Sequence, residues 1–251
     1  MLTAERRQFI LTVLHRDGTV VAKKLSEELN LSEDTIRRDL RDLAAEGLLQ
    51  RVHGGALPIS PAVANFASRQ NQEPGAKSAI ARAAASMVRE GQVVLFDGGT
   101  TNIEVARNLS QDLHATVITN SPPLAVALAD HPHIEVIMLG GHLFKHSLVT
   151  VGVATLDALQ MVRADLYMLG ICSLHPKVGI STVDLDEAYL KRAMIACSAE
   201  VVALASPEKI NTAAPYIVGP LSELTDIITE HGISDEMLEP YRSLGITITR
   251  A

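Results

Sequence analysis

The sequence predicts an α/β protein with two folded parts, a small N-terminal winged helix-turn-helix and a larger, mostly parallel α/β domain. Residues 1–58 contain three segments with helical spacing of apolar residues, followed by a hairpin pattern centred on glycines. Residues 76–251 instead alternate strand-like and helix-like segments, which is typical of a parallel sheet covered by helices. Residues 59–75, with their Pro, Ser, Asn and Gln content, are expected to form a linker.

The composition is that of a globular protein with a sizeable core. The chain is 47% hydrophobic and 20% charged, and no apolar run approaches the roughly 18 residues that a membrane helix requires. We therefore expect a cytoplasmic protein with no membrane partner. Cys172 and Cys197 form no C-x-x-C pair and the histidines are scattered, so no disulfide framework, metal site or cofactor is expected.

The net charge of −7 at first argues against a nucleic-acid partner, but its distribution changes the argument. Residues 1–58 carry nine Lys and Arg against nine Asp and Glu, so the acidity lies wholly in the rest of the chain. A neutral small domain can still bind DNA if its basic groups gather on one face.

The helices of the small domain are delimited by recognisable start and stop signals. They are expected at residues 4–16, 22–29 and 33–46. Asp17-Gly18 ends the first, Ser32 is placed to cap the third at its N-terminus, and Gly47 ends it. The second and third are separated by a three-residue turn, which predicts a helix-turn-helix.

The third helix has an apolar face and a basic face. Ile36, Leu40, Leu43 and Ala44 fall on one side. The other side carries Asp34, Arg38, Arg41 and Asp42, flanked by Thr35 and Arg37. Guanidinium groups near the start of such a helix suit base edges and phosphates in a major groove. An ordinary solvated helix with an ion pair from Asp34 to Arg38 explains this pattern equally well, so the helix alone leaves both interpretations open.

The segment after this helix favours DNA binding. Residues 48–52 form an expected strand, residues 53–55 a glycine turn and residues 56–57 a returning strand. A hairpin in this position is the wing of a winged helix, where Arg51 and His53 would meet the sugar-phosphate backbone.

The small domain resembles the DeoR family of bacterial repressors. The resemblance lies in the run from Ser32 to Leu40, in Leu43, Gly47 and Arg51, and in the run from His53 to Ala56, and it extends to Arg6, Ile10 and Leu14 in the first helix. In that family the module binds operator DNA. The residues expected to contact double-stranded operator DNA are Ser32, Asp34, Thr35, Arg37, Arg38, Arg41, Arg51 and His53.

The larger domain is expected to place its ligand at the carboxyl ends of its strands. The expected helices are 76–89, 102–109, 123–129, 154–161 and 187–199; the expected strands are 93–96, 115–119, 134–139, 165–169 and 201–205, with shorter ones near Ile217, Ile227 and Ile248. Three loops after successive strands, 97–101, 119–121 and 139–141, are rich in small polar residues and are expected to converge on one anion pocket. No dinucleotide, Walker or serine-hydrolase motif is present, so a small phosphorylated sugar fits better.

The larger domain also resembles the DeoR family, whose C-terminal sensor is similar in fold to ribose-phosphate isomerases. By that likeness Thr100, Thr101, Asn120 and Ser121 would hold the phosphate, with Lys191 as a counter-charge; a capped, ion-paired helix start is the alternative for Asp186, Glu187 and Lys191. The residues expected to contact the effector are Asp97, Gly98, Gly99, Thr100, Thr101, Asn120, Ser121, Gly140, Gly141, Glu187, Lys191 and Lys209.

One departure from the family pattern bears on the ligand. After the strand at 201–205 the family usually has an aspartate and, three residues on, a lysine; here Ser206 replaces the aspartate and Lys209 keeps the lysine. The lost carboxylate removes an acceptor for sugar hydroxyls, so a different effector or a weakened pocket is expected.

The preferred hypothesis is a dimeric or tetrameric repressor of a carbohydrate-catabolism operon, controlled by a phosphorylated sugar. Two winged helices would double the contacts of one and match a palindromic site. Two alternatives stay open. The first is a sugar-phosphate isomerase with a DNA-binding appendage, for which Asp97 and Glu187 are candidate bases although no catalytic residue is assigned. The second is a metabolite-binding protein with no role on DNA.

Overall fold

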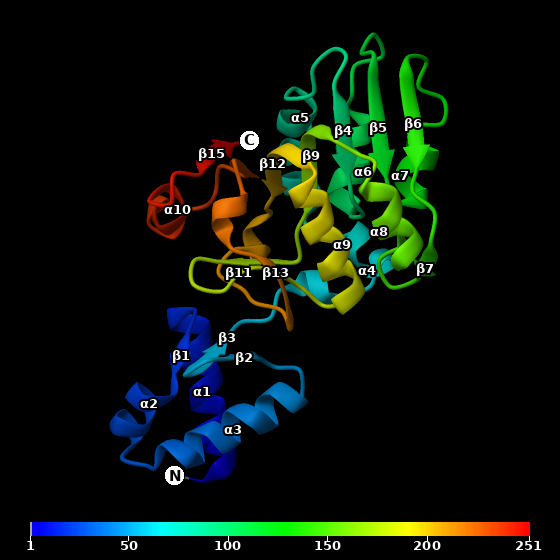
Figure 1. Ribbon diagram of the computed structural model, residues 1–251. Coiled ribbons are helices and arrows are strands. Elements are labelled where there is room, and N and C mark those ends of the chain that lie inside the picture. Colours follow the sequence, from blue (N-terminus) through cyan, green and yellow to red (C-terminus); the bar gives the residue numbers. More distant parts are fainter. Residues whose placement is uncertain (1) are drawn as a thin grey trace.

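The computed structural model describes residues 2–251 and shows a small N-terminal domain beside a larger α/β domain (Figure 1). The small domain consists of helices α1 (Thr3–Asp17), α2 (Ala22–Leu29) and α3 (Glu33–Ala45) and strands β1 (Val20–Val21), β2 (Gln50–Val52) and β3 (Gly55–Leu57). The three strands pair antiparallel in the order β1-β3-β2. The predicted winged helix-turn-helix is therefore confirmed.

The local sequence accounts for these elements. Ile10, Leu25, Ile36, Leu40 and Leu43 are at most 2% exposed and form a common core, as their helical spacing predicts. The Ser32 hydroxyl accepts a hydrogen bond from the Thr35 N–H at 3.2 Å, which caps α3. Leu48 and Leu49 precede the wing strand and are not part of it.

A buried ion pair holds α3 against α1. The Arg6 guanidinium donates two hydrogen bonds to the Asp39 carboxylate, one from Nε and one from Nη2, the latter at 3.0 Å. Arg6 is 9% and Asp39 2% exposed. Arg7 lies beside them and contacts Asp42 and Glu46, so Asp42 does not point freely away from the core as the wheel suggested. These contacts fix which face of α3 turns outward.

The segment between the two domains is folded onto the larger one. It contains a short 3-10 helix, η1 (Pro61–Val63), helix α4 (Phe66–Gln70) and the start of α5 (Pro74–Ala85). Phe66 is buried, and its N–H donates to the His146 carbonyl at 2.8 Å. The Ala213 N–H donates to the Pro58 carbonyl at 3.3 Å. These contacts hold the segment against the larger domain.

The larger domain is built on a seven-stranded parallel sheet, which confirms the predicted fold class. Its strand order is β15-β14-β12-β9-β4-β5-β6. The strands are β4 (Val93–Phe96), β5 (Ala115–Thr119), β6 (Ile134–Met138), β9 (Ala164–Gly170), β12 (Ser198–Leu204), β14 (Asp226–Thr229) and β15 (Thr247–Arg250). Helices α5, α6 (Thr100–Arg107) and α7 (Pro122–Ala127) cover one face, and α8 (Val153–Leu159), α9 (Leu185–Ala196) and α10 (Asp235–Arg242) the other (Figure 1).

Several short elements were not expected from the sequence. A hairpin of β7 (His142–Phe144) and β8 (Val149–Val151) follows β6, and a small antiparallel sheet joins β10 (Ser173–His175), β11 (Gly179–Thr182) and β13 (Tyr216–Gly219). The strand expected near Ile217 is therefore present but lies outside the parallel sheet. Such strands of three or four residues are too short to show a period. Helix α10 was missed because its sequence is polar and contains Pro240.

We predict that Arg6→Ala destabilises the small domain by about 3 kcal/mol, because the substitution leaves the buried Asp39 carboxylate without its principal partner. Urea denaturation with hydrogen exchange of the α1 and α3 amides measures this loss. Arg16→Ala is the control, because Arg16 pairs with Asp17 at the surface, where both side chains are exposed. Equal protection of α3 in both variants would contradict the prediction.

Candidate effector site and nucleic-acid interface

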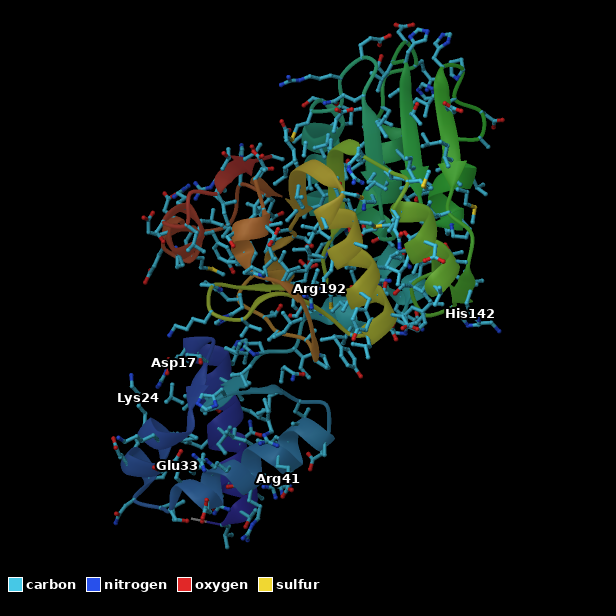
Figure 2. All side chains as sticks on the ribbon, in the orientation of Figure 1. Asp17, Lys24, Glu33, Arg41, His142 and Arg192 are labelled. Carbon is cyan, nitrogen blue, oxygen red and sulfur yellow. The ribbon has the colours of Figure 1, made fainter. Side chains whose placement is uncertain are left out.

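Helix α3 presents an exposed basic face. Arg37, Arg38 and Arg41 are all exposed, and among residues 2–251 only Arg37 of these three forms an ion pair, with Glu33 at 2.7 Å. The pair from Asp34 to Arg38, on which the alternative of an ordinary solvated helix relied, does not form. Strands of the wing and helix α1 lie between α3 and the larger domain, and Arg41 projects from the helix (Figures 1 and 2). This face is free of the acidic domain.

The other residues expected at DNA lie around the same face. Asp34 is exposed near the N-terminus of α3, while Thr35 is half-buried and its hydroxyl lies 2.8 Å from that of Ser32. Arg51 on β2 and His53 in the turn before β3 are exposed on the wing. The arrangement can offer guanidinium groups to a groove and a second basic contact from the wing.

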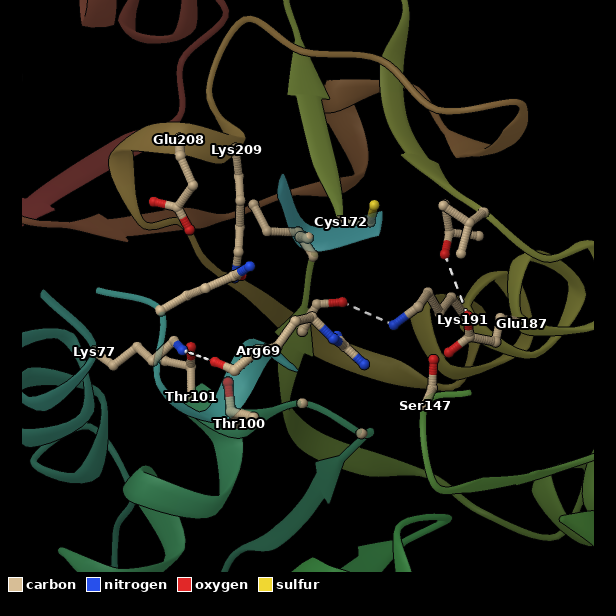
Figure 3. A pocket seen from close by; sticks show the side chains of 18 residues that line it. Arg69, Lys77, Thr100, Thr101, Ser147, Cys172, Glu187, Lys191, Glu208 and Lys209 are labelled. Carbon is tan, nitrogen blue, oxygen red and sulfur yellow. Dashed lines mark hydrogen bonds between the residues drawn. The ribbon is translucent and has the colours of Figure 1, made fainter. Parts of the chain in front are cut away.

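In the larger domain, a pocket lies at the carboxyl ends of β4 and β9. Strands that follow β4 in the sequence, β5 and β6, lie on one side of it in the sheet, and the later strands from β9 onward lie on the other side. Open parallel sheets bind ligands at this point. The pocket is shown in Figure 3. It is lined by Ala62, Arg69, Gln72, Lys77, Gly98, Gly99, Thr100, Thr101, Ser147, Gly170, Ile171, Cys172, Thr182, Val183, Glu187, Lys191, Glu208 and Lys209.

Asp97 lies behind the pocket and uses both carboxylate oxygens within the protein. Its Oδ1 accepts from the Gly170 N–H at 2.7 Å and from Asn102 Nδ2 at 2.8 Å. Its Oδ2 accepts from the Tyr167 hydroxyl at 2.7 Å and from the Lys191 ammonium. Lys191 also donates to the Gly170 carbonyl at 2.7 Å. Asp97 and Lys191 are thus a buried, neutralised pair that positions the pocket wall.

Three further cations line the pocket, and in the described part of the chain none of them has a carboxylate partner comparable to the one that Asp97 provides for Lys191. Arg69 of α4 has two buried nitrogens, Nε and Nη2, that have no hydrogen-bond partner among residues 2–251, and burial lowers the pKa of its guanidinium. Burial also lowers the pKa of Lys77, whose ammonium donates to the Arg69 carbonyl. Burial lowers the pKa of Lys209 to about 8, a shift that the nearby Glu208 partly offsets. This grouping favours an anionic ligand.

Two carboxylates complete the lining. Glu187 of α9 is 8% exposed, and burial raises its pKa despite the nearby Lys191 and Arg69. Its N–H donates to the Asp184 side chain at 3.0 Å, which caps α9. Glu208 follows β12 in the 3-10 helix η2 (Pro207–Lys209) and accepts from the Ser206 hydroxyl at 2.6 Å. The pocket therefore combines cationic donors with carboxylate acceptors.

The loop after β4 brings backbone to the same pocket. Helix α6 begins at Thr100, and its first N–H groups have no partner within the helix. Gly98 is required by space, because a Cβ there would lie 2.1 Å from the Val149 side chain. Gly99 has φ +141°, which side chains rarely adopt. The loop can donate backbone N–H groups to an anion at the helix N-terminus.

The structure brings only the first of the three expected loops to the pocket. Asn120 and Ser121 are buried behind it, and Asn120 Nδ2 donates to the Thr150 carbonyl at 2.9 Å. Gly140 and Gly141 pack against other elements: the Thr155 hydroxyl donates to the Gly140 carbonyl at 2.7 Å. The expected convergence of three loops is therefore replaced by one loop and five other segments.

Sequence reasoning missed most of those other segments. Arg69, Gln72 and Lys77 come from the inter-domain segment and α5, Ser147 from the loop before β8, and Glu208 from η2. One signal was available: Arg69 is the single basic residue in the otherwise weakly charged stretch 59–75.

Both parts of the chain match known domain families. Residues 6–62 match the DeoR-like helix-turn-helix domain, and residues 72–231 match the DeoR C-terminal sensor domain. The chain belongs to the DeoR family. It is 34% identical to the HTH-type transcriptional regulator GlpR of Haloferax volcanii over 99% of this chain and 98% of that protein. It is 30% identical to a putative aga operon transcriptional repressor of Escherichia coli O157:H7, covering 98% and 93%.

Solved structures with a related arrangement are distant from this DeoR-family regulator. Ribose 5-phosphate isomerase A of Methanocaldococcus jannaschii aligns with a TM-score of 0.38 at 15% identity, covering 53% of this chain and 52% of that one. The sorbitol operon regulator SorC of Klebsiella pneumoniae aligns with a TM-score of 0.37 at 11% identity, covering 84% and 91%. Among residues 2–251, no helix is long and apolar enough to span a membrane.

We predict that Lys209→Met stabilises the larger domain at neutral pH and that the gain shrinks as pH rises. The folded-state pKa of Lys209, about 8, lies below the ordinary value of 10.5, so the unfolded chain binds more protons between these values and wild-type stability rises with pH there. The difference between variant and wild type should narrow by about 2 kcal/mol from pH 7 to pH 9.5. Urea denaturation at each pH measures it; a difference independent of pH would refute the prediction.

Proposed function

We propose that this DeoR-family protein is a cytoplasmic repressor that binds operator DNA and is controlled by a phosphorylated sugar in the pocket between β4 and β9. The observation that supports effector binding is the pair of buried Arg69 nitrogens that have no hydrogen-bond partner within residues 2–251, in a pocket with Lys77 and Lys209. A phosphate offers several anionic acceptors, which would satisfy these donors. The exposed arginines of α3 support the DNA half.

The inter-domain segment supports a coupling between the two halves. Arg69 and Gln72 line the pocket, while Pro58 at the other end of the segment ends the DNA-binding domain. A ligand that binds Arg69 would favour one position of this segment and therefore one arrangement of the winged helices. We propose a homodimer or a tetramer, because a neutral winged helix makes few phosphate contacts alone.

We predict that Arg38→Ala weakens binding to DNA from upstream of the protein's own gene by about 10- to 100-fold, because Arg38 is exposed on α3 and forms no ion pair with any of residues 2–251. Fluorescence anisotropy at several salt concentrations measures both affinity and salt slope. Arg192→Ala is the matched control, since Arg192 is exposed on α9 of the other domain. Equal loss in both variants, or no loss in Arg38→Ala, would argue against α3 as the DNA-contacting helix.

We predict that Arg69→Met weakens binding of inorganic phosphate by at least about tenfold, because it removes the charge-assisted donors that the pocket leaves unpaired. Isothermal titration with phosphate measures this, with Arg82→Met on the exposed side of α5 as control. Unchanged phosphate binding in Arg69→Met would refute the anion site. Conversion of pentose or hexose phosphates at an enzymatic rate by the wild type would instead favour the isomerase alternative.

A further inference from the structure

The pocket has a second unsatisfied group, and it is of the opposite kind. Glu208 Oε2 is buried and has no hydrogen-bond partner among residues 2–251, while Oε1 accepts from the Ser206 hydroxyl at 2.6 Å. Ser206 is 1% exposed, so this bond is shielded from water and fixes the carboxylate. Figure 3 shows the Glu208 side chain directed from η2 toward Lys77. Because Glu208 lines the pocket, its unpaired oxygen is an acceptor that a bound ligand could use.

Inorganic phosphate alone would not donate a favourable hydrogen bond to this acceptor. A phosphate group presents acceptors to Arg69 and Lys209, but next to Glu208 its negative charge is repelled. A ligand that satisfies both ends carries an anionic group and, a few bonds away, a hydrogen-bond donor without charge. A hydroxyl group of a phosphorylated polyol is such a donor.

This arrangement explains why Ser206 can stand where the family usually has an aspartate. The carboxylate expected at position 206 is absent, and a carboxylate two residues later reaches the same pocket and is held by the Ser206 hydroxyl. The acceptor for a sugar hydroxyl is therefore relocated rather than lost. An acceptor at position 208 would meet a different hydroxyl of a ligand than one at position 206, because it extends from η2 on a longer side chain.

We propose that Glu208, positioned by Ser206, is the specificity-determining residue of the pocket and selects phosphorylated polyols over simple phosphate by accepting a hydrogen bond from a ligand hydroxyl. This inference rests on the proposed effector site and adds the part of the ligand that the cations do not recognise. Glu187 is the other carboxylate of the lining, but its Oε2 accepts a hydrogen bond from the Thr182 hydroxyl at 3.5 Å, so it is less free to meet a ligand.

The test measures discrimination rather than affinity alone. Wild type, Glu208→Gln, Glu208→Met and Ser206→Ala are titrated with inorganic phosphate and with ribose 5-phosphate, glucose 6-phosphate, fructose 6-phosphate and glycerol 3-phosphate. Glu223→Gln is the control, since Glu223 is exposed on η3 (Leu221–Glu223), another 3-10 helix of the same domain. Circular dichroism and melting temperature verify that each variant is folded.

We expect the wild type to bind at least one of the four organic phosphates more tightly than inorganic phosphate. Glu208→Gln should reduce that preference about tenfold and Glu208→Met more, while both leave inorganic phosphate binding within about twofold or tighten it. Ser206→Ala should lose about threefold, because the carboxylate stays but is no longer held. Glu223→Gln should match the wild type.

Two results would overturn the assignment of Glu208 while leaving the anion site intact. The first is a wild type that binds inorganic phosphate at least as tightly as all four organic phosphates. The second is a Glu208 variant whose affinities for phosphate and for organic phosphate fall together or not at all, which indicates a merely structural role or none. Absence of phosphate binding in the wild type, or binding insensitive to Arg69→Met, would refute the proposed effector site itself.

Discussion

The buried carboxylate of Asp97 is the contact on which the architecture of the pocket depends. It joins β4 to β9 through the Gly170 N–H and the Tyr167 hydroxyl, and to α9 through Lys191. Burial and the adjacent Asp97 charge raise the pKa of Tyr167 well above its ordinary value, so Tyr167 remains a donor. Because Asp97 neutralises Lys191, that carboxylate is not available to compensate Arg69 or Lys209.

Because Asp97 is paired with Lys191, the cations Arg69, Lys77 and Lys209 give the pocket an excess of positive charge. Burying a guanidinium without a partner is costly, and the lowered pKa values of Arg69, Lys77 and Lys209 record this cost. Such a cost is tolerated in a binding pocket because a ligand can offset it. Glycine at position 170 allows β9 to approach the loop after β4 closely, because a Cβ there would lie 2.4 Å from the Gly98 carbonyl oxygen.

The sequence was sufficient for the elements whose pattern is local. The three helices of the small domain and strands β4 and β5 follow from periodicity and capping, and the exposed arginines of α3 follow from its wheel. The ion pair between Arg6 and Asp39 joins residues 33 positions apart, which no local pattern encodes. The Arg69 side of the pocket likewise depends on contacts between segments that are distant in the sequence. The loop at Gly140-Gly141 shows the converse difficulty: Gly141 is required by close packing, because a Cβ there would lie 2.2 Å from the Thr155 hydroxyl oxygen, and the sequence pattern does not distinguish such a glycine from one that binds a ligand.

The position of Arg69 limits how strongly a ligand can act on DNA binding. A ligand shifts a conformational equilibrium only by the difference in its interaction with the two states. If only the arrangement with Arg69 in the pocket offers its charge-assisted bonds, that difference is about 1.5–3 kcal/mol, or roughly a 10- to 100-fold change in operator affinity for each chain. In the proposed dimer, two chains acting on one palindromic site would combine their shifts, so the proposed coupling needs no contact between the ligand and the winged helix.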